Sequence, residues 1–131
     1  MNQQNRIQWA LLSLRLGVFI VMGVWTLDKF INPGHAAKIF EKFYSLPGIE
    51  HAALYAMGGL QALLVLAFVA GFKKRISYGA ILLMHTVSTL SSWKAYLDMN
   101  MLFFAAWPML AACFTLYILR DLDTKYTLDP L

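Results

Sequence analysis

Charged residues are scarce in this chain of 131 residues, at 14% of the total, whereas hydrophobic residues make up 60%. Soluble domains carry about 25% charged and about 45–50% apolar residues, so the composition argues against an ordinary soluble domain. The 11 basic and 7 acidic residues give a net charge of +4, but the basic ones form short clusters between apolar runs. That pattern is typical of orientation signals in membrane proteins and argues against a nucleic-acid-binding surface.

Cysteine is almost absent, since Cys113 is the only one and lies inside an apolar run. An intrachain disulfide and a dithiol motif are therefore excluded, and Cys113 is expected to pack as a small apolar residue. The histidines, His35, His51 and His85, are spaced too unevenly to favour a two-ligand haem or a zinc site. No small-residue cleavage signal follows the first apolar run, which Arg15 interrupts, so this run is expected to be retained.

Four long apolar segments dominate the chain, at about residues 9–27, 52–72, 76–93 and 101–119. Each is near the ~20 residues that a helix needs to cross a membrane. The runs are too continuous for the alternating strands of a barrel, and helices satisfy their backbone within lipid. The sequence therefore predicts an all-α integral membrane four-helix bundle, as a single domain over residues 1–131.

The connection between the first two segments contains a short helical pattern of its own. Asn32 is a suitable N-cap and Pro33 suits the first helical position. The apolar positions Ala36, Ile39, Phe40 and Phe43 then repeat at helical spacing. This pattern predicts a short amphipathic extracytoplasmic helix, with Phe40 and Phe43 buried against the bundle or lipid.

Two expectations concern the C-terminal part of the chain. Pro108 lies inside the fourth segment, where a proline removes a backbone hydrogen bond, and it is expected to kink the helix. The polar tail from Arg120 onward is expected to be loosely ordered.

Arg15 lies roughly four to six residues inside the first segment, where a charge is costly. Two arrangements satisfy it: the side chain extends back to the membrane surface, or it faces the bundle interior. Arg15, Thr26 and Lys29 share one helical face, which favours the interior. No carboxylate lies in the middle of a segment, so Gln61 in the second segment is the expected partner.

The third segment carries a polar stripe of His85, Ser88 or Thr89, and Ser92. These side chains either line a small outward-opening cavity or bond to their own backbone. We hypothesise an interior polar network of Arg15, Thr26, Lys29, Gln61, His85 and Ser92. Such a network would suit a quinone, a phenolic or carboxylic ligand, or an anion. No catalytic or metal-binding residue is predicted, and a carboxylate proton relay is disfavoured.

The stretch "LRLGVFIVMGVWTLDKFINP" resembles the first span of the DoxX-like family of small four-span membrane proteins, through Arg15, Gly17, Gly23, Lys29 and Pro33. The stretch "GGLQALLVLAFVAGF" resembles the second span of that family. The resemblance covers nearly the whole chain in the number and spacing of segments. One departure is Gln61, where the family often has a glutamate that could neutralise the intramembrane arginine.

The resemblance implies an inner-membrane accessory protein associated with a redox system and able to hold a quinone or other lipophile. Members of the family resemble a small subunit of a thiosulfate:quinone oxidoreductase, and distant animal relatives assist the assembly of membrane proteins. An assembly or chaperone factor and a small membrane oxidoreductase subunit are therefore the alternatives. Expected partners are the lipid bilayer, membrane redox proteins and a second copy of the chain, and no nucleic acid is expected to bind. The chain is not expected to be an enzyme on its own.

The cluster Lys73, Lys74 and Arg75 lies in the shortest connection and predicts that both termini are cytoplasmic in a bacterial-type inner membrane. A reporter that is active only in the periplasm should be inactive when fused after Leu131. The same reporter should be active when inserted within residues 38–44. Periplasmic activity from the C-terminal fusion would reverse the predicted orientation.

Overall fold

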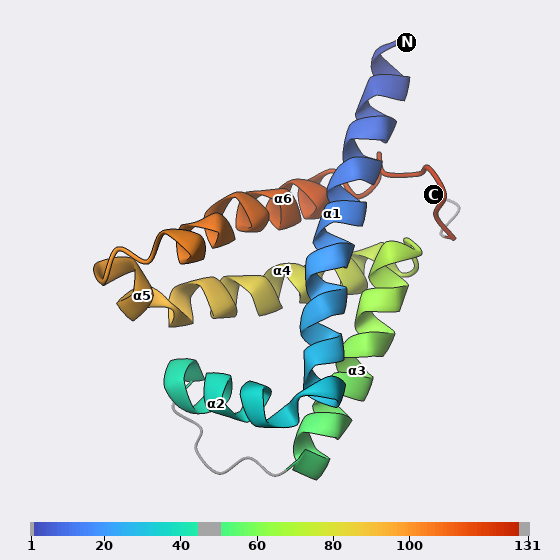
Figure 1. Cartoon of the computed structure of the whole chain (residues 1–131). Coiled ribbons are helices and arrows are strands. Elements are labelled where there is room, and N and C mark those ends of the chain that lie inside the picture. The colour runs from blue at the N-terminus through green and yellow to red at the C-terminus, as the bar shows by residue number, and fades with distance from the viewer. Residues whose placement is uncertain (1, 45–50, 129–131) are drawn as a thin grey trace.

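The computed structural model describes residues 2–44 and 51–128, in which every regular element is a helix (Figure 1). The elements are α1 (Gln3–Ile31), α2 (Pro33–Tyr44), α3 (His51–Val69), α4 (Lys74–Ser91), α5 (Trp93–Leu97), the 3-10 helix η1 (Met101–Ala105) and α6 (Ala106–Ile118). The all-helical class is thus confirmed for this part of the chain.

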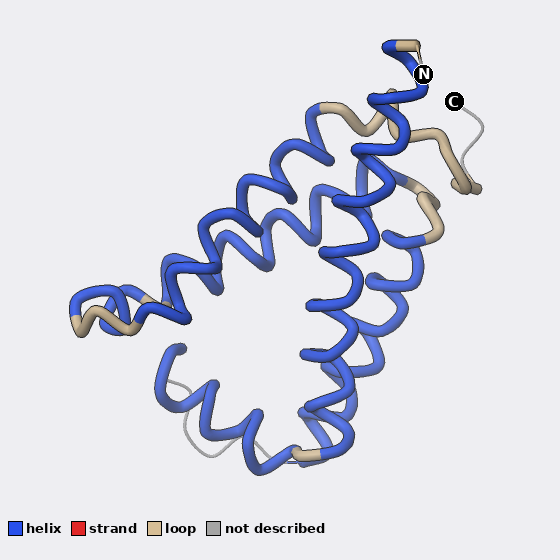
Figure 2. The backbone as a smooth tube through the Cα atoms, turned by 45° about the horizontal axis from the view of Figure 1, so that its top comes forward, coloured by secondary structure: helices blue, strands red, loops and turns tan. Residues whose placement is uncertain are grey.

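The long helices form two pairs that diverge from one end of the molecule. α1 packs along α3, and α4 packs along α6; we call these pairs the first and the second arm. Figure 2 shows the arms meeting near the C-terminal tail and separating toward the other end, where α2 lies. α2 packs on α1 and α3 and also contacts α4.

The hydrophobic core lies where the arms meet. Its buried residues come from all four long helices: Leu11, Val18 and Met22 from α1, Val65 and Phe68 from α3, Tyr78 and Ile81 from α4, and Cys113 and Leu116 from α6. Cys113 is 1% exposed, as expected for a small packing residue. The divergence of the arms follows, because this core joins them only at that end.

Glycines allow the helices within each arm to approach closely. A Cβ atom added to Gly58 of α3 would lie 2.9 Å from the ring of Phe30 on α1. A Cβ atom added to Gly79 of α4 would lie 3.2 Å from the ring of Tyr117 on α6. Both distances are shorter than ordinary carbon contacts, so a side chain at either position would require the facing aromatic ring to move.

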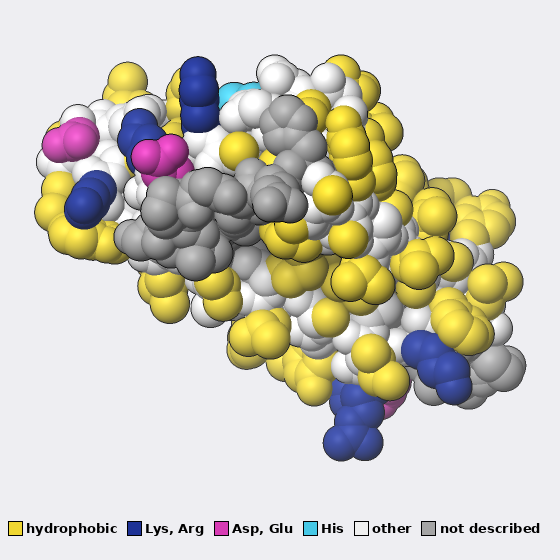
Figure 3. Space-filling view, turned by 90° about the horizontal axis from the view of Figure 1, so that it is seen from below, with side chains coloured by type: hydrophobic (Ala, Val, Ile, Leu, Met, Phe, Trp, Pro, Cys, Tyr) yellow, Lys and Arg dark blue, Asp and Glu magenta, His cyan; other side chains and the backbone are white. Residues whose placement is uncertain are grey.

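Among the described residues, three helical stretches are long and apolar enough to cross a membrane: Gln3–Ile31, Ala52–Val69 and Met101–Ile118. Large apolar side chains on these stretches are exposed, among them Ile20, Leu60 and Phe114. The face in Figure 3 shows hydrophobic side chains over its middle and charged side chains gathered toward its ends. Composition and exposure together suit association with a membrane.

Pro108 lies in the first turn of an α-helix. The fourth segment is divided into η1 and α6, and Pro108 is the third residue of α6. In the first turn of an α-helix the missing N–H has no intrahelical partner to lose. The proline thus lies where the 3-10 helix passes into α6, and the expected kink stays a prediction.

The short helix after the first segment is confirmed as α2, beginning at Pro33. The Asn32 side chain accepts a hydrogen bond from the backbone N–H of His35 at 3.4 Å, as an N-cap does. The expected burial of Phe40 and Phe43 concerns side chains that lie outside the described part of the structure.

A buried ion pair joins α1 to the C-terminal tail. Arg15 is 1% exposed and its Nη1 lies 2.8 Å from Oδ1 of Asp123, which is 0% exposed. The Nη2 of Arg15 also donates to the backbone carbonyl oxygens of Lys125, at 2.6 Å, and Tyr126, at 3.4 Å. Arg15 therefore faces the interior, as the shared helical face indicated.

The same carboxylate is bound from α4. Tyr78 donates its hydroxyl to Oδ2 of Asp123 at 2.6 Å. The Nζ of Lys74 donates to the backbone carbonyl oxygens of Asp123, at 2.5 Å, and Arg120, at 3.2 Å, just beyond the end of α6. The buried ammonium group thus has backbone acceptors in the segment that follows α6. We call Arg15, Lys74, Tyr78 and Asp123 the tail clamp.

Two expectations about this region are wrong. Gln61 is not a partner of Arg15, whose hydrogen bonds all go to Asp123 and to tail carbonyl groups. The tail is not loosely ordered as far as residue 128, because the clamp holds Asp123 and the N–H of Leu128 donates to the carbonyl oxygen of Ala70 at 2.8 Å. The carboxylate that the spans lack is supplied by the tail.

We expect Asp123→Asn to lower the free energy of unfolding by about 3–5 kcal/mol, because it leaves the buried guanidinium of Arg15 without its counter-charge. Asp121→Asn is the matched control, since Asp121 is exposed, and should change stability by less than about 0.5 kcal/mol. Denaturant titration in detergent micelles measures both.

A double-mutant cycle gives a second test of the tail clamp. The variant Arg15→Leu/Asp123→Asn should be destabilised by less than the sum of its two single variants, because both charges are then removed together. Additive effects, or equal effects of Asp123→Asn and Asp121→Asn, would show that the ion pair does not hold the tail.

Candidate functional site

A groove of about 780 Å³ lies between the two arms. Residues of α1, α2, α4, η1 and α6 line it, so it reaches from the arm junction toward α2. Ligand pockets commonly measure about 300–1,000 Å³, so the groove has room for a molecule of ordinary cofactor size. Exposed residues, including Val24 and Leu102, belong to its lining, so the groove opens onto the molecular surface.

One face of α1 forms the first wall of the groove. Gly17, Val18, Val21, Trp25 and Asp28 line it, at the spacings of three to four residues that place side chains on one helical face. Gly17 presents no side chain, and a Cβ atom added there would meet nothing within 4 Å. The wall is therefore apolar along most of its length and becomes polar near α2.

The opposite wall comes from η1 and α6 and is apolar. Phe103, Ala106, Met109 and Ala112 contribute to it. The wall combines small residues, a flexible methionine and one aromatic ring, so it can accommodate a hydrocarbon or an aromatic ring. The two walls together favour a ligand that is mostly apolar.

Polar groups gather at the end of the groove near α2. His35 Nδ1 lies 2.8 Å from Oδ2 of Asp28, with side-chain exposures of 54% and 28%. Lys29 lines the same region. Because this cluster is partly solvated, it provides a polar mouth with mixed charge and only weak electrostatic attraction of its own.

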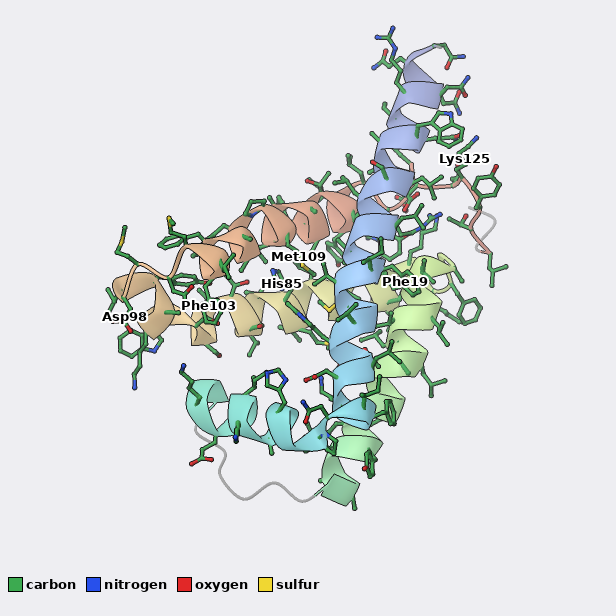
Figure 4. The ribbon with its side chains drawn as sticks, in the orientation of Figure 1. Phe19, His85, Asp98, Phe103, Met109 and Lys125 are labelled. Carbon is green, nitrogen blue, oxygen red and sulfur yellow. The ribbon has the colours of Figure 1, made fainter. Side chains whose placement is uncertain are left out.

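His85 lies deeper in the groove and is 1% exposed. Figure 4 shows it beside Met109, where α4 and α6 face each other. Its Nε2 lies 2.9 Å from the carbonyl oxygen of Ala106, which ties α4 to α6. The ring also stacks on Trp25 of α1, with centroids 5.9 Å apart and planes 29° apart. Two helices besides its own thus fix the imidazole in place.

Two serines, Ser88 of α4 and Ser92 just after its end, extend this polar lining toward the mouth. Ser88 lies three residues after His85, Ser92 lies four residues after Ser88, and both line the same groove. The Ser92 hydroxyl donates to the backbone carbonyl oxygen of Ser88 at 3.0 Å. The two alternatives considered for this stripe therefore both hold, because the serines line a cavity and Ser92 also bonds to its own helix.

The six residues of the hypothesised network do not form one cluster. The groove brings together Lys29, His85 and Ser92. Thr26 is buried, and its hydroxyl donates to the carbonyl oxygen of Met22 one turn back. Gln61 is buried in α3 outside the groove lining, and Arg15 belongs to the tail clamp.

Sequence reasoning did not find several polar members of the groove and the clamp. Asp28 and His35 of the mouth are close in sequence, and their spacing of seven residues across the start of α2 was a usable signal. Lys74, Tyr78 and Asp123 gave no such signal, because their contacts join parts of the chain that are 45 or more residues apart.

Among the described residues, no three His, Cys, Asp or Glu side chains come together as a metal ligand set. The chain matches no family model, no curated protein and no solved structure. Fold and groove together define a small helical protein with three stretches able to cross a membrane and a largely apolar groove between two helix pairs.

Proposed function

We propose that this chain is a membrane-embedded binding module that holds a quinone-like lipophile in the groove between its arms. The observation that carries the proposal is the groove itself: its walls are apolar, and the buried imidazole of His85 lies within it. An apolar pocket with a few fixed polar groups is the usual form of a site for a small lipophilic ligand.

In the proposed membrane setting the chain has four spans, which are the three stretches named above and α4. The mean hydropathy of α4 is low because it carries polar residues, but Lys74, Ser77, Tyr78, His85 and Thr89 are all buried. Apart from Arg75 at its start, its exposed large side chains are apolar, namely Ile76, Leu83, Val87 and Leu90. A helix with its polar face inside and its apolar face outside suits lipid better than water.

The groove favours a binding module over an assembly factor. An assembly factor that binds the spans of other proteins needs an exposed helix surface for that contact, and it does not need an open interior. A groove of about 780 Å³ that reaches the surface allows the head of a lipophile to lie inside and its tail to extend into the bilayer. The proposed redox association, the DoxX-like membership and the cytoplasmic termini are supported by the sequence pattern described above.

Two glycines of α1 offer a matched test. Gly17 lines the groove and Gly23 does not, and in both cases a Cβ atom would meet nothing within 4 Å. Gly17→Phe should fill part of the groove and weaken the binding of a decyl-substituted benzoquinone or its hydroquinone at least tenfold, or about 1.4 kcal/mol. Gly23→Phe should leave binding unchanged.

Equilibrium dialysis of the detergent-solubilised full chain measures the affinity of each redox form separately. Thermal unfolding of both variants should match that of the unmodified chain, so that a loss of binding is not a loss of folding. The proposed function fails if neither redox form binds, or if both variants bind as well as the unmodified chain.

A further inference from the structure

The hydrogen bond of His85 fixes which of its ring nitrogens carries the proton. Nε2 lies 2.9 Å from the carbonyl oxygen of Ala106, and a carbonyl oxygen can only accept. Nε2 is therefore the donor. In a neutral imidazole the other nitrogen, Nδ1, then carries a lone pair and is an acceptor.

The charged form of this histidine is disfavoured by its surroundings. The side chain is 1% exposed, and the ion pairs among the described residues are Arg15 with Asp123 and His35 with Asp28. Among the described residues that line the groove, Asp28 is the only carboxylate, and it is already bound to His35. A buried imidazolium would have no counter-charge of its own, so the neutral ring with its proton on Nε2 is the stable form.

Nδ1 of His85 is a buried acceptor without a hydrogen-bond partner in the described part of the chain. Leaving such an atom unsatisfied is unfavourable, and buried polar atoms without partners are rare. Trp25 stacks against the ring and offers it no donor in that geometry. The atom itself is closed to solvent, but its side chain lines the groove, so a molecule in the groove is the nearest source of a donor once the lining side chains shift.

We propose that the groove selects a lipophile whose head is a phenol or hydroquinone, with a hydroxyl that donates its hydrogen bond to Nδ1 of His85. This inference rests on the proposed function and narrows its ligand class. An oxidised quinone presents only carbonyl acceptors, which cannot satisfy another acceptor. The aromatic lining supplied by Trp25 and Phe103 suits a planar head.

Ser88 places a second polar group at a suitable position. It lies three residues after His85 on α4 and lines the same groove, so its side chain is about 5–6 Å away at the Cβ atoms. A hydroxyl group can donate or accept, so Ser88 can bind the second oxygen of a hydroquinone. A hydroquinone head would thus have a partner for each oxygen.

A ligand series tests the hydroxyl directly. The probes are decylhydroquinone, the same molecule with both hydroxyl groups replaced by fluorine, and decylbenzoquinone, all under anaerobic conditions with the full chain in detergent. Fluorine is close to a hydroxyl group in size but cannot donate. We expect decylhydroquinone to bind about tenfold more tightly than either other probe, as one buried hydrogen bond allows.

Variants on α4 assign the preference to His85. In His85→Phe the preference for decylhydroquinone over decylbenzoquinone should disappear, because Ser88 can still bind one oxygen of either probe. Thr86→Val is the matched control, because Thr86 is the next residue, lies outside the groove lining and bonds to Leu82 of its own helix. It should keep the tenfold preference for decylhydroquinone.

Nitrogen NMR of the folded chain tests the tautomer without a change at His85. With ¹⁵N-labelled histidine, Nδ1 of His85 should give the signal of an unprotonated nitrogen, assigned by its loss in His85→Gln. Decylhydroquinone should move that signal toward the hydrogen-bonded range, and the difluoro probe should not. A protonated Nδ1 in the free protein would overturn the inference whether or not His85→Phe folds.

The outcomes separate the two proposals. Equal binding of all three probes would leave the lipophile site in place and refute the choice of a hydroxyl donor. Binding of none of them would refute the proposed function itself.

Discussion

The buried pair of Arg15 and Asp123 is the interaction on which this structure depends. It joins the first helix to the tail, and Tyr78 and Lys74 join the same tail segment to α4. Both arms are therefore held at one end, beside the core that their helices share. Since nothing comparable joins the first arm to the second at the other end within the described residues, the arms diverge and a groove remains between them.

The groove also depends on how α1 divides its faces. One side of this helix packs against α3, closely enough that Gly58 is needed opposite Phe30. Another side carries Gly17, Val21 and Trp25 along the groove. His85 connects that wall to α6 through its stack on Trp25 and its bond to Ala106. The candidate site is thus supported by the same helices that build the fold, which is the arrangement that keeps a binding site rigid.

The sequence was sufficient for features that depend on local pattern. Hydrophobic periodicity and capping residues predicted the helices and the start of α2 at Pro33, and the face that Arg15 shares with Thr26 indicated its burial. The partner of Arg15 could not be predicted from the sequence, because Asp123 lies 108 residues away in a tail that has the composition of an ordinary polar segment. The groove could not be predicted from the sequence either, because its volume depends on the angle between the arms and not on any local motif.

The position of Asp123 near the end of the sequence has a consequence for biosynthesis. In the membrane-embedded protein proposed above, α1 enters the bilayer with Arg15 before the residue that neutralises it has been made. At about 5–20 residues per second, the ribosome adds the intervening 108 residues in about 5–20 s. During that interval the first helix must be sheltered by the insertion machinery, by water or by lipid headgroups. The contact that neutralises Arg15 in the first span can therefore form only after these 108 further residues have been made.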